Sequence, residues 1–340
     1  MRPSREEINV SPITKTVRNI VLVLVALSGL LKSPDTRAYQ ISGPNLGYVA
    51  DSTSSTLRVI NGIPGASAMG KQVSGDLKIQ RTQVSLERDY ALTVNDKGAV
   101  WLIADLSGVP SILPIADALN GGDALTLSPN GSLAAIYSAN SSRIQIIGGL
   151  PLNPAIHFEV DTVGLGQNLT ALAINDTKNV VAAFSDGETG ALYLWSAGTA
   201  PRLISTVGLV SGITFDAGGH RAVIADRAWN QIVLFEDLAT TATPIQLAGS
   251  ADGISNPVGV LLSKDVKTAY IANEGLGTVT VVNIAGGEVR DISCRCRPTT
   301  MRLLRGDLRF ALTERADEPT VVFDAESTDP HVVIVPAKSP

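Results

Sequence analysis

The segment Ala269–Asn283, AYIANEGLGTVTVVN, decides the fold of this chain. An alternating apolar strand ends at Asn273, the polar turn Glu274–Gly277 follows, and a second alternating strand begins at Thr278. Two period-two strands on either side of a short turn with glycine indicate a β-hairpin. The same arrangement returns six more times along the 340 residues.

Each of the seven hairpins has an acidic or amide residue where its first strand ends. These residues are Asp51, Asn95, Asn140, Asp186, Asp226, Asn273 and Glu314. Successive members are 40 to 47 residues apart, which is the period of a four-stranded propeller blade. Because short Asp and Asn side chains bond to the backbone of their own turns, we interpret this series as turn caps and not as a ring of metal ligands.

Two further strands accompany most hairpins. One precedes the hairpin, as in SGITFDAGGHRAVIAD from Ser211, and one follows it, as in VRDIS from Val289. A single four-stranded sheet cannot bury its faces alone, and seven of them stacked in a closed ring can. We therefore predict an all-β fold, a seven-bladed β-propeller of four-stranded antiparallel blades over residues 39–340. An open solenoid would need atypical end caps, and none is seen.

The sequence does not decide which segment closes the ring. The first blade, around Tyr48 to Ile79, looks incomplete at its inner edge, and His331–Val335 forms a lone strand near the C-terminus. That strand is expected either to be the outer strand of the last blade or to complete the first blade. Ala38–Ser42 is an alternative source of the missing strand.

Two hairpins resemble known repeats. AYIANEGLGTVTVVN from Ala269 resembles the repeat of YVTN-type propellers, and IADRAWNQIVLFE from Ile224 is similar to the NHL-type repeat. NPVGVLLSKD from Asn256 resembles the strand that precedes the hairpin in both. The resemblance implies a scaffold that serves binding proteins, electron-carrier enzymes and lactone hydrolases, so it transfers no activity.

The first 38 residues have the layout of an export signal. Arg2, Arg5, Lys15 and Arg18 precede the uncharged run Ile20–Leu31, and small residues follow near Ala38. As a helix this run would reach roughly 18 Å, which is short of the ~30 Å hydrocarbon core. We expect a cleaved signal peptide and a periplasmic or extracellular protein. The alternative is an uncleaved, shallow N-terminal anchor, without other stable membrane insertion.

The overall charge excludes one class of partner. Residues 1–38 hold six of the 27 basic and three of the 32 acidic residues, so 21 and 29 remain and the net charge is near −8. An acidic body binds polyanions poorly, so nucleic acid is not an expected partner. We expect a monomer that binds an unknown protein or small-molecule ligand. Only 4% of the residues are aromatic, which speaks against a roomy aromatic ligand site.

Residues with catalytic or metal-binding chemistry are few. The chain has three histidines, His157, His220 and His331, and each falls in a segment expected to lie away from the central channel. The sequence has no GxSxG elbow, phosphate-binding glycine loop or dense Asp/Asn calcium loop. No metal or cofactor is predicted, and no catalytic residue is assigned.

Cys294 and Cys296 are the only cysteines and lie in ISCRCRPTTMR from Ile292. In a strand, residues two apart share a face with Cα atoms about 6.5 Å apart, near the upper limit for a disulfide. We therefore expect either a strained, easily reduced disulfide or a pair of thiols, with a redox or metal-thiolate role as the alternative. Arg297 and Arg302 follow the pair and are candidate charges at the mouth of the channel.

The three tryptophans are expected to differ. Trp101 and Trp195 lie inside strands and are expected to pack within blades, whereas Trp229 occupies the polar turn of its hairpin. Trp229 is therefore the candidate partner contact, because tryptophan is enriched at interaction hot spots. The tryptophan-rich docking pattern of quinone-dependent propeller dehydrogenases is missing, which argues against that family.

Two functions are compatible with these features. The first is a binding or interaction scaffold that uses the loop faces and the channel mouth. The alternative is a lactonase-like propeller hydrolase, which needs a cluster of Glu, Asp, Asn or His on the inner strands. The expected inner strands, such as ALTLS from Ala124 and SGITF from Ser211, are mostly apolar or hydroxyl-bearing, which favours the scaffold.

Overall fold

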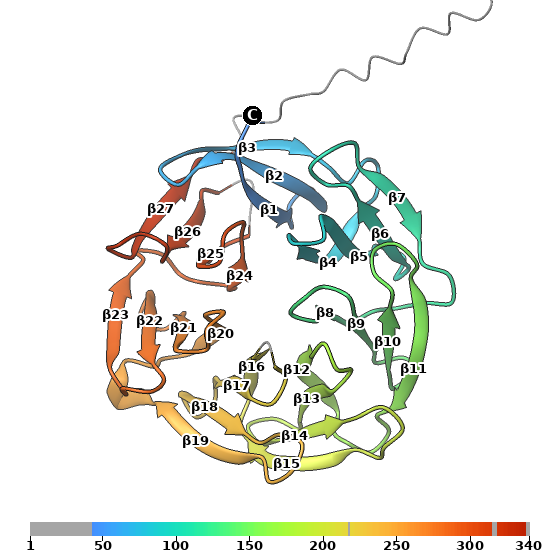
Figure 1. Ribbon diagram of the computed structural model, residues 1–340, viewed down its shortest axis with the longest axis vertical. Helices are drawn as coiled ribbons and strands as arrows, with labels where there is room; N and C mark the ends of the chain where they lie inside the picture. The colour runs from blue at the N-terminus through green and yellow to red at the C-terminus, as the bar shows by residue number, and fades with distance from the viewer. Residues whose placement is uncertain (1–42, 217, 315–317, 338–340) are drawn as a thin grey trace, which may run out of the picture. The chain divides into compact units, whose positions relative to one another are not determined.

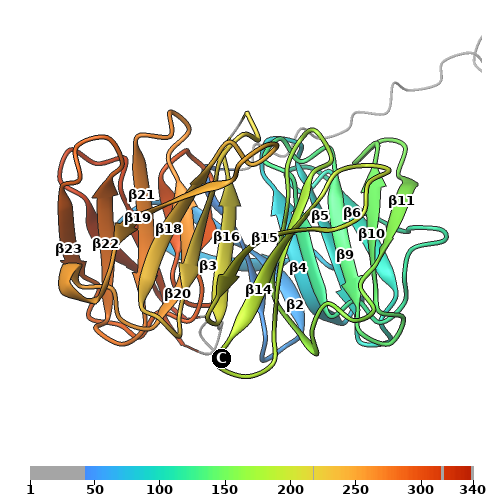
Figure 2. The ribbon, with the colours of Figure 1, turned by 90° about the horizontal axis from the view of Figure 1, so that it is seen from below.

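The protein is an all-β, seven-bladed propeller. The computed structural model describes residues 43–216, 218–314 and 318–337, which form seven antiparallel sheets and one short 3₁₀ turn, η1 (Ser250–Asp252). The sheets are arranged in a ring around a central axis (Figure 1). Seen from the side, the strands run between two faces made of turns and loops (Figure 2). The predicted fold is confirmed.

Six blades have four strands, which follow the chain from the channel to the rim. The second blade contains β4 (Ile79–Ser85), β5 (Tyr90–Asn95), β6 (Val100–Ala104) and β7 (Ser111–Pro114). The third blade contains β8 (Ala124–Leu127), β9 (Ala134–Ser138), β10 (Arg143–Gly148) and β11 (Ala155–Asp161). The fourth blade contains β12 (Asn168–Ile174), β13 (Val180–Ser185), β14 (Gly190–Trp195) and β15 (Arg202–Val207). The fifth blade contains β16 (Val210–Phe215), β17 (Ala222–Asp226), β18 (Gln231–Glu236) and β19 (Thr243–Ala248). The sixth blade contains β20 (Pro257–Leu262), β21 (Thr268–Asn273), β22 (Thr278–Asn283) and β23 (Val289–Ser293). The seventh blade contains β24 (Arg302–Leu303), β25 (Arg309–Ala311), β26 (Thr320–Asp324) and β27 (His331–Val335).

The first blade has three strands in the described part of the chain. These are β1 (Asn45–Asp51), β2 (Thr56–Ile63) and β3 (Ala66–Gln72), and β1 leads into the hairpin that follows the second strand in the other blades. β27 pairs with β26 and is the outer strand of the last blade, which settles the role of His331–Val335. The alternative donor Ala38–Ser42 and the leader 1–38 lie outside the described residues. Within the described ranges no helix is long and apolar enough to cross a membrane.

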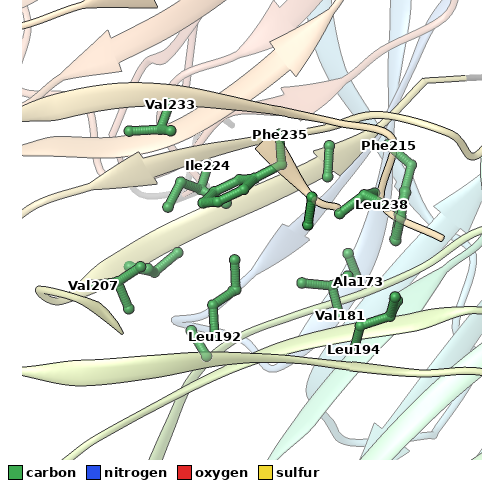
Figure 3. Packing of buried hydrophobic residues seen from close by; sticks show 14 residues of the cluster. Ala173, Val181, Leu192, Leu194, Val207, Phe215, Ile224, Val233, Phe235 and Leu238 are labelled. Atoms are coloured by element: carbon green, nitrogen blue, oxygen red, sulfur yellow. The ribbon is translucent and has the colours of Figure 1, made fainter. Parts of the chain in front are cut away.

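The hydrophobic core lies between the blades. The described residues form seven buried clusters, and each cluster joins two neighbouring blades. Figure 3 shows one of them, in which Val181 and Leu192 of the fourth blade meet Ile224 and Phe235 of the fifth. Full burial of such a side chain stabilises the fold by about 1.5–3 kcal/mol. Packing between blades is therefore the main source of stability.

The ring closes through one of these clusters. Leu46, Val49 and Ile60 of the first blade pack against Val322 and Val335 of the last. The described part of the last blade takes all four strands from the C-terminal end of the chain, so in the described residues the ends of the ring share no sheet. They meet by side-chain packing and by a main-chain hydrogen bond from the Arg305 N–H to the Leu46 carbonyl oxygen at 2.7 Å.

Among the acidic and amide residues of the hairpins, Asp51, Asn95 and Asp226 cap their own turns, as the sequence predicts. Asp186 and Asn273 instead accept N–H groups of the links between blades, and Glu314 pairs with Arg302. Asp51 Oδ1 accepts the Thr53 N–H at 3.0 Å, and Asn95 Oδ1 accepts the Lys97 N–H at 3.0 Å. Asp226 has a second role, because its Oδ2 accepts the Gly208 N–H at 2.7 Å, which ties the hairpin turn to the link between blades.

Replacement of Ile60 by alanine tests closure by packing. Ile60 is fully buried, so Ile60→Ala should lower the free energy of unfolding by about 2–5 kcal/mol. Ile63 lies on the same strand but is 54% exposed, and Ile63→Ala should cost less than about 1 kcal/mol. Urea unfolding followed by circular dichroism measures both, and equal losses would contradict the proposed closure.

Candidate functional site

The inner strands β4, β12 and β16 begin with an irregularity that alters which residues face the channel. The register to the second strand shifts between Ile79 and Arg81, between Leu169 and Ala171, and between Val210 and Gly212. Each shift inserts one extra residue, and such bulges redirect side chains. The extra residues are Gln80, Thr170 and Ser211, and all three line a pocket in the channel.

This channel pocket has a volume of about 590 Å³, within the range of sites for small ligands. Hydroxyl, amide and charged groups dominate its wall. Its lining comprises Ala50, Asp51, Ser52, Thr56, Ile79, Gln80, Arg81, Thr82, Gln83, Asp123, Ala124, Leu125, Leu169, Thr170, Ala171, Leu172, Ser211, Arg302 and Glu314. The pocket lies on the side of the propeller that carries the turns between second and third strands and the links between blades. We call this side the hairpin face.

The first blade contributes to the pocket in a different way from the others. Ala50, Asp51, Ser52 and Thr56 belong to the end of β1 and the hairpin turn after it, whereas the second to fifth blades contribute their inner strands and the residue before β8. The three-stranded form of the described first blade thus exposes the β1 hairpin to the channel.

Arg302 extends from β24 across this part of the channel. Its Nη1 donates to the carbonyl oxygen of Thr82 on β4 at 2.7 Å, so it connects the last blade to the second. Its Nε forms a close ion pair with Glu314, which follows β25. The sequence places Arg302 at the channel mouth, and in the structure its side chain lines the pocket.

The environment of Glu314 affects its ionisation. Burial raises the pKa of the Glu314 carboxyl, and the nearby Arg302 guanidinium opposes that rise. Arg302 therefore stabilises a carboxylate that would otherwise be poorly solvated.

The other carboxylates of the pocket also have partners. Asp51 accepts two N–H groups of its turn and pairs with Arg58 Nε at 3.4 Å, while Asp123 Oδ2 accepts the Ala139 N–H at 2.7 Å. The three histidines lie on β11, before β17 and on β27, and the pocket lining does not include them. No group of three or more His, Cys, Asp or Glu side chains in the described ranges is placed to hold a metal ion.

The remaining candidates meet elsewhere on the hairpin face. Glu274, in the turn after β21, pairs through Oε2 with Arg227 Nη2 at 2.6 Å and through Oε1 with Arg297 Nη2 at 2.6 Å. Asn256, in the link between the fifth and sixth blades, donates from Nδ2 to Glu274 Oε2 at 2.8 Å. Arg297 therefore belongs to a network that joins two hairpin turns and two links, and it does not line the channel pocket.

Cys294 and Cys296 form a disulfide in the structure. They follow β23 and do not lie in a strand, because Arg295 between them has a φ of +49° and turns the chain. Their Cα atoms are 5.0 Å apart, closer than strand geometry would place them. The expectation based on a strand is wrong in this respect. Both residues pack on the cluster between the sixth and seventh blades, next to Arg297.

Trp229 is 46% exposed and lies in the turn beside this network. The backbone N–H of Trp229 donates to Asp226 Oδ1 at 3.1 Å. The indole ring lies close to Gly208, because a Cβ added at Gly208 would be 3.1 Å from Cδ1 of Trp229. Leu276, in the next hairpin turn, is 56% exposed. Trp195 is buried between the third and fourth blades and Trp101 is half-buried on β6.

Some of these residues have no signal in the sequence. Glu274 and Leu276 occupy a polar turn, where an acidic residue and a single leucine are unremarkable. Arg81 and Asp123 are 42 positions apart. One blade period is about that long, and this spacing is the only sequence feature that could place both residues on the wall of one pocket.

Replacement of Arg302 tests the role of its ion pair. Arg302→Met leaves the Glu314 carboxyl buried without its cation, and we expect a loss of about 1–3 kcal/mol in the free energy of unfolding near neutral pH. A carboxyl whose pKa is higher in the folded than in the unfolded protein binds more protons when folded, so stability falls as pH rises through that interval. The deficit should therefore be larger at pH 8 than at pH 5, as measured by urea unfolding.

The matched control for this experiment is the double variant Arg302→Met with Glu314→Gln. Compared with Glu314→Gln alone, neither protein has an ionisable group at position 314, so the deficit of the double variant should be the same at both pH values. A deficit of Arg302→Met that does not change with pH would contradict the assigned role.

Comparisons with solved structures agree with the fold. A functionally unknown protein from Desulfotomaculum acetoxidans DSM 771 is 14% identical, covers 87% of this chain and 100% of its own, and has a TM-score of 0.61. A protein from Lactobacillus plantarum is 13% identical with a TM-score of 0.62, over 86% of this chain and 96% of its own. Virginiamycin B lyase from Staphylococcus aureus is 12% identical with a TM-score of 0.56, over 76% and 84%.

These similarities show the fold alone, because the identities are low. No protein-family model and no curated protein matches the chain. The structures confirm the β-propeller scaffold that the resemblance of the Ala269 and Ile224 hairpins implies, and they do not transfer a ligand or a reaction.

Proposed function

We propose that this propeller is an exported binding scaffold whose hairpin face docks a protein partner. The observation that carries the proposal is the pair of exposed apolar side chains, Trp229 and Leu276, on adjacent hairpin turns. Tryptophan anchors protein interfaces because it buries a large rigid surface at a small entropic cost.

The turns that hold this pair are fixed before a partner arrives. The Arg227–Glu274 ion pair joins the two turns at 2.6 Å, and Asn256 N–H donates to Asn230 Oδ1 at 2.6 Å. Arg297 forms an ion pair with the same Glu274 carboxylate, and most of its side chain is exposed to solvent. A preorganised surface binds with less loss of conformational entropy, which supports an interaction role.

Export and a monomeric state belong to the same proposal. The basic and apolar layout of residues 1–38 and the disulfide between Cys294 and Cys296 support a location outside the cytoplasm, because disulfides persist in oxidising compartments. The acidic composition of residues 39–340 argues for a protein or small-molecule partner and against nucleic acid.

The lactonase-like alternative has less support. It requires an inner-strand cluster of Glu, Asp, Asn or His, whereas Asp51 and Glu314 of the pocket are paired with Arg58 and Arg302 and the pocket lining includes no histidine. Nothing in the described residues favours hydrolysis over binding.

The test is capture of partners from an extract of the cell envelope by the purified protein. Trp229→Ala and Leu276→Ala should each deplete the same captured protein by roughly tenfold or more, since a hot spot contributes about 2 kcal/mol or more. Quantitative mass spectrometry of the bound fraction measures this depletion.

Leu203 on β15 provides the control. It is 56% exposed, as Leu276 is, but lies on the rim of the ring, so Leu203→Ala should leave capture unchanged. Retention of all captured proteins by both Trp229→Ala and Leu276→Ala would rule out this face as the docking surface.

A further inference from the structure

Two opposite charges in the channel pocket have no ionic partner among the described residues. Arg81 lies on β4 and is exposed, with no hydrogen bond or ion pair to another residue that the structure describes. Asp123 lies immediately before β8 and is also exposed. Its Oδ2 accepts the Ala139 N–H at 2.7 Å, and its other oxygen has no partner in the described ranges.

Arg81 and Asp123 lie at the same level of the channel. Gln83 Nε2 donates to the carbonyl oxygen of Leu125 at 3.1 Å, which fixes β4 against β8. Arg81 precedes Gln83 by two residues, and Asp123 precedes Leu125 by two. Because alternate residues of a strand point to the same side, Arg81 extends toward the third blade, as Gln83 does.

The other charges of the pocket are neutralised within the protein. Asp51 pairs with Arg58 and Glu314 pairs with Arg302. A simple anion at Arg81 would meet repulsion from Asp123, and a simple cation at Asp123 would meet repulsion from Arg81. The complementary ligand carries both charges close together.

We propose that the channel pocket binds a small zwitterion of the α-amino-acid type, with its carboxylate on Arg81 and its ammonium group on Asp123. The planar guanidinium matches a carboxylate with two parallel hydrogen bonds. Gln80, the extra residue of the bulge, provides an amide beside Arg81 without a partner in the described chain. The volume of about 590 Å³ leaves room for a side chain on the ligand.

Thr170 and Ser211 restrict which other groups the ligand carries. Thr170 Oγ1 donates to the Ala183 carbonyl at 3.3 Å, and Ser211 Oγ donates to the Pro257 carbonyl at 2.6 Å. Because both hydroxyl protons are donated to backbone carbonyl oxygens, the two hydroxyl oxygens can only accept hydrogen bonds from a ligand. Leu169 and Leu172 are apolar neighbours on the same strand, so this wall suits an apolar or donor-bearing side chain.

This site is independent of the proposed docking of a protein on Trp229 and Leu276. A failure of partner capture leaves the ligand experiment unaffected, and the reverse also holds.

The test is titration calorimetry of the purified protein with a panel of free α-amino acids of increasing side-chain size. At least one should bind, and its N-acetyl and carboxamide derivatives should each bind roughly tenfold or more weakly, because each lacks one charge. Arg81→Gln and Asp123→Asn should each cause a comparable loss. Asparagine can still accept the Ala139 N–H, so Asp123→Asn keeps the local fold.

Arg290 and Asp329 form an exposed ion pair at 3.4 Å that includes a residue of the outer strand β23, and they provide matched controls. Arg290→Gln and Asp329→Asn should leave the affinity unchanged. The proposal fails if no amino acid binds, if the blocked derivatives bind as well as the parent, or if Arg81→Gln and Asp123→Asn bind as the unmodified protein does. If Arg81→Gln does not fold, the blocked derivatives and Asp123→Asn decide the outcome.

Discussion

The second strand of each blade needs apolar neighbours on both faces, and the rest of the structure depends on this requirement. All residues of β5, β9, β13 and β17 are buried, including those that point to opposite sides of their sheets. A lone blade would expose both of these faces to water, at a cost of about 25 cal/mol per Å² of apolar surface. Each blade is therefore stabilised by two neighbours, and the seven clusters between blades supply them.

Because stability comes from these interfaces, the channel and the hairpin face can carry polar groups. The inner strands β4, β8 and β12 are less buried than the second strands, and most of their positions are half-buried or exposed. The bulges of β4 and β12 add Gln80 and Thr170 to the pocket. The first blade, which has three strands in the described chain, widens the same space. Polar groups that can bind a ligand therefore lie at the channel and on the hairpin face, away from the buried clusters between blades.

The fold could be predicted because its signals are local. Period-two alternation, a polar turn and an acidic or amide residue at the strand end recur within each hairpin, as at Asn273, and they require no knowledge of distant residues. The sites could not be predicted in the same way. Arg81 and Asp123 line the same pocket, and Arg302 meets Thr82, only after the blades close into a ring. The sequence predicts a strand at the cysteine pair, because an arginine gives no sign of the positive φ that Arg295 adopts.

The central claim is that the blades stabilise one another as a single closed unit. Trp101, Trp195 and Trp229 lie in the second, fourth and fifth blades, so three variants that each retain one tryptophan report on separate parts of the ring. Urea unfolding of each variant should show the same midpoint by its own fluorescence as by far-ultraviolet circular dichroism, which reports on the whole ring. In any one variant, a fluorescence midpoint clearly separated from the circular dichroism midpoint would show that blades unfold independently and would contradict the account.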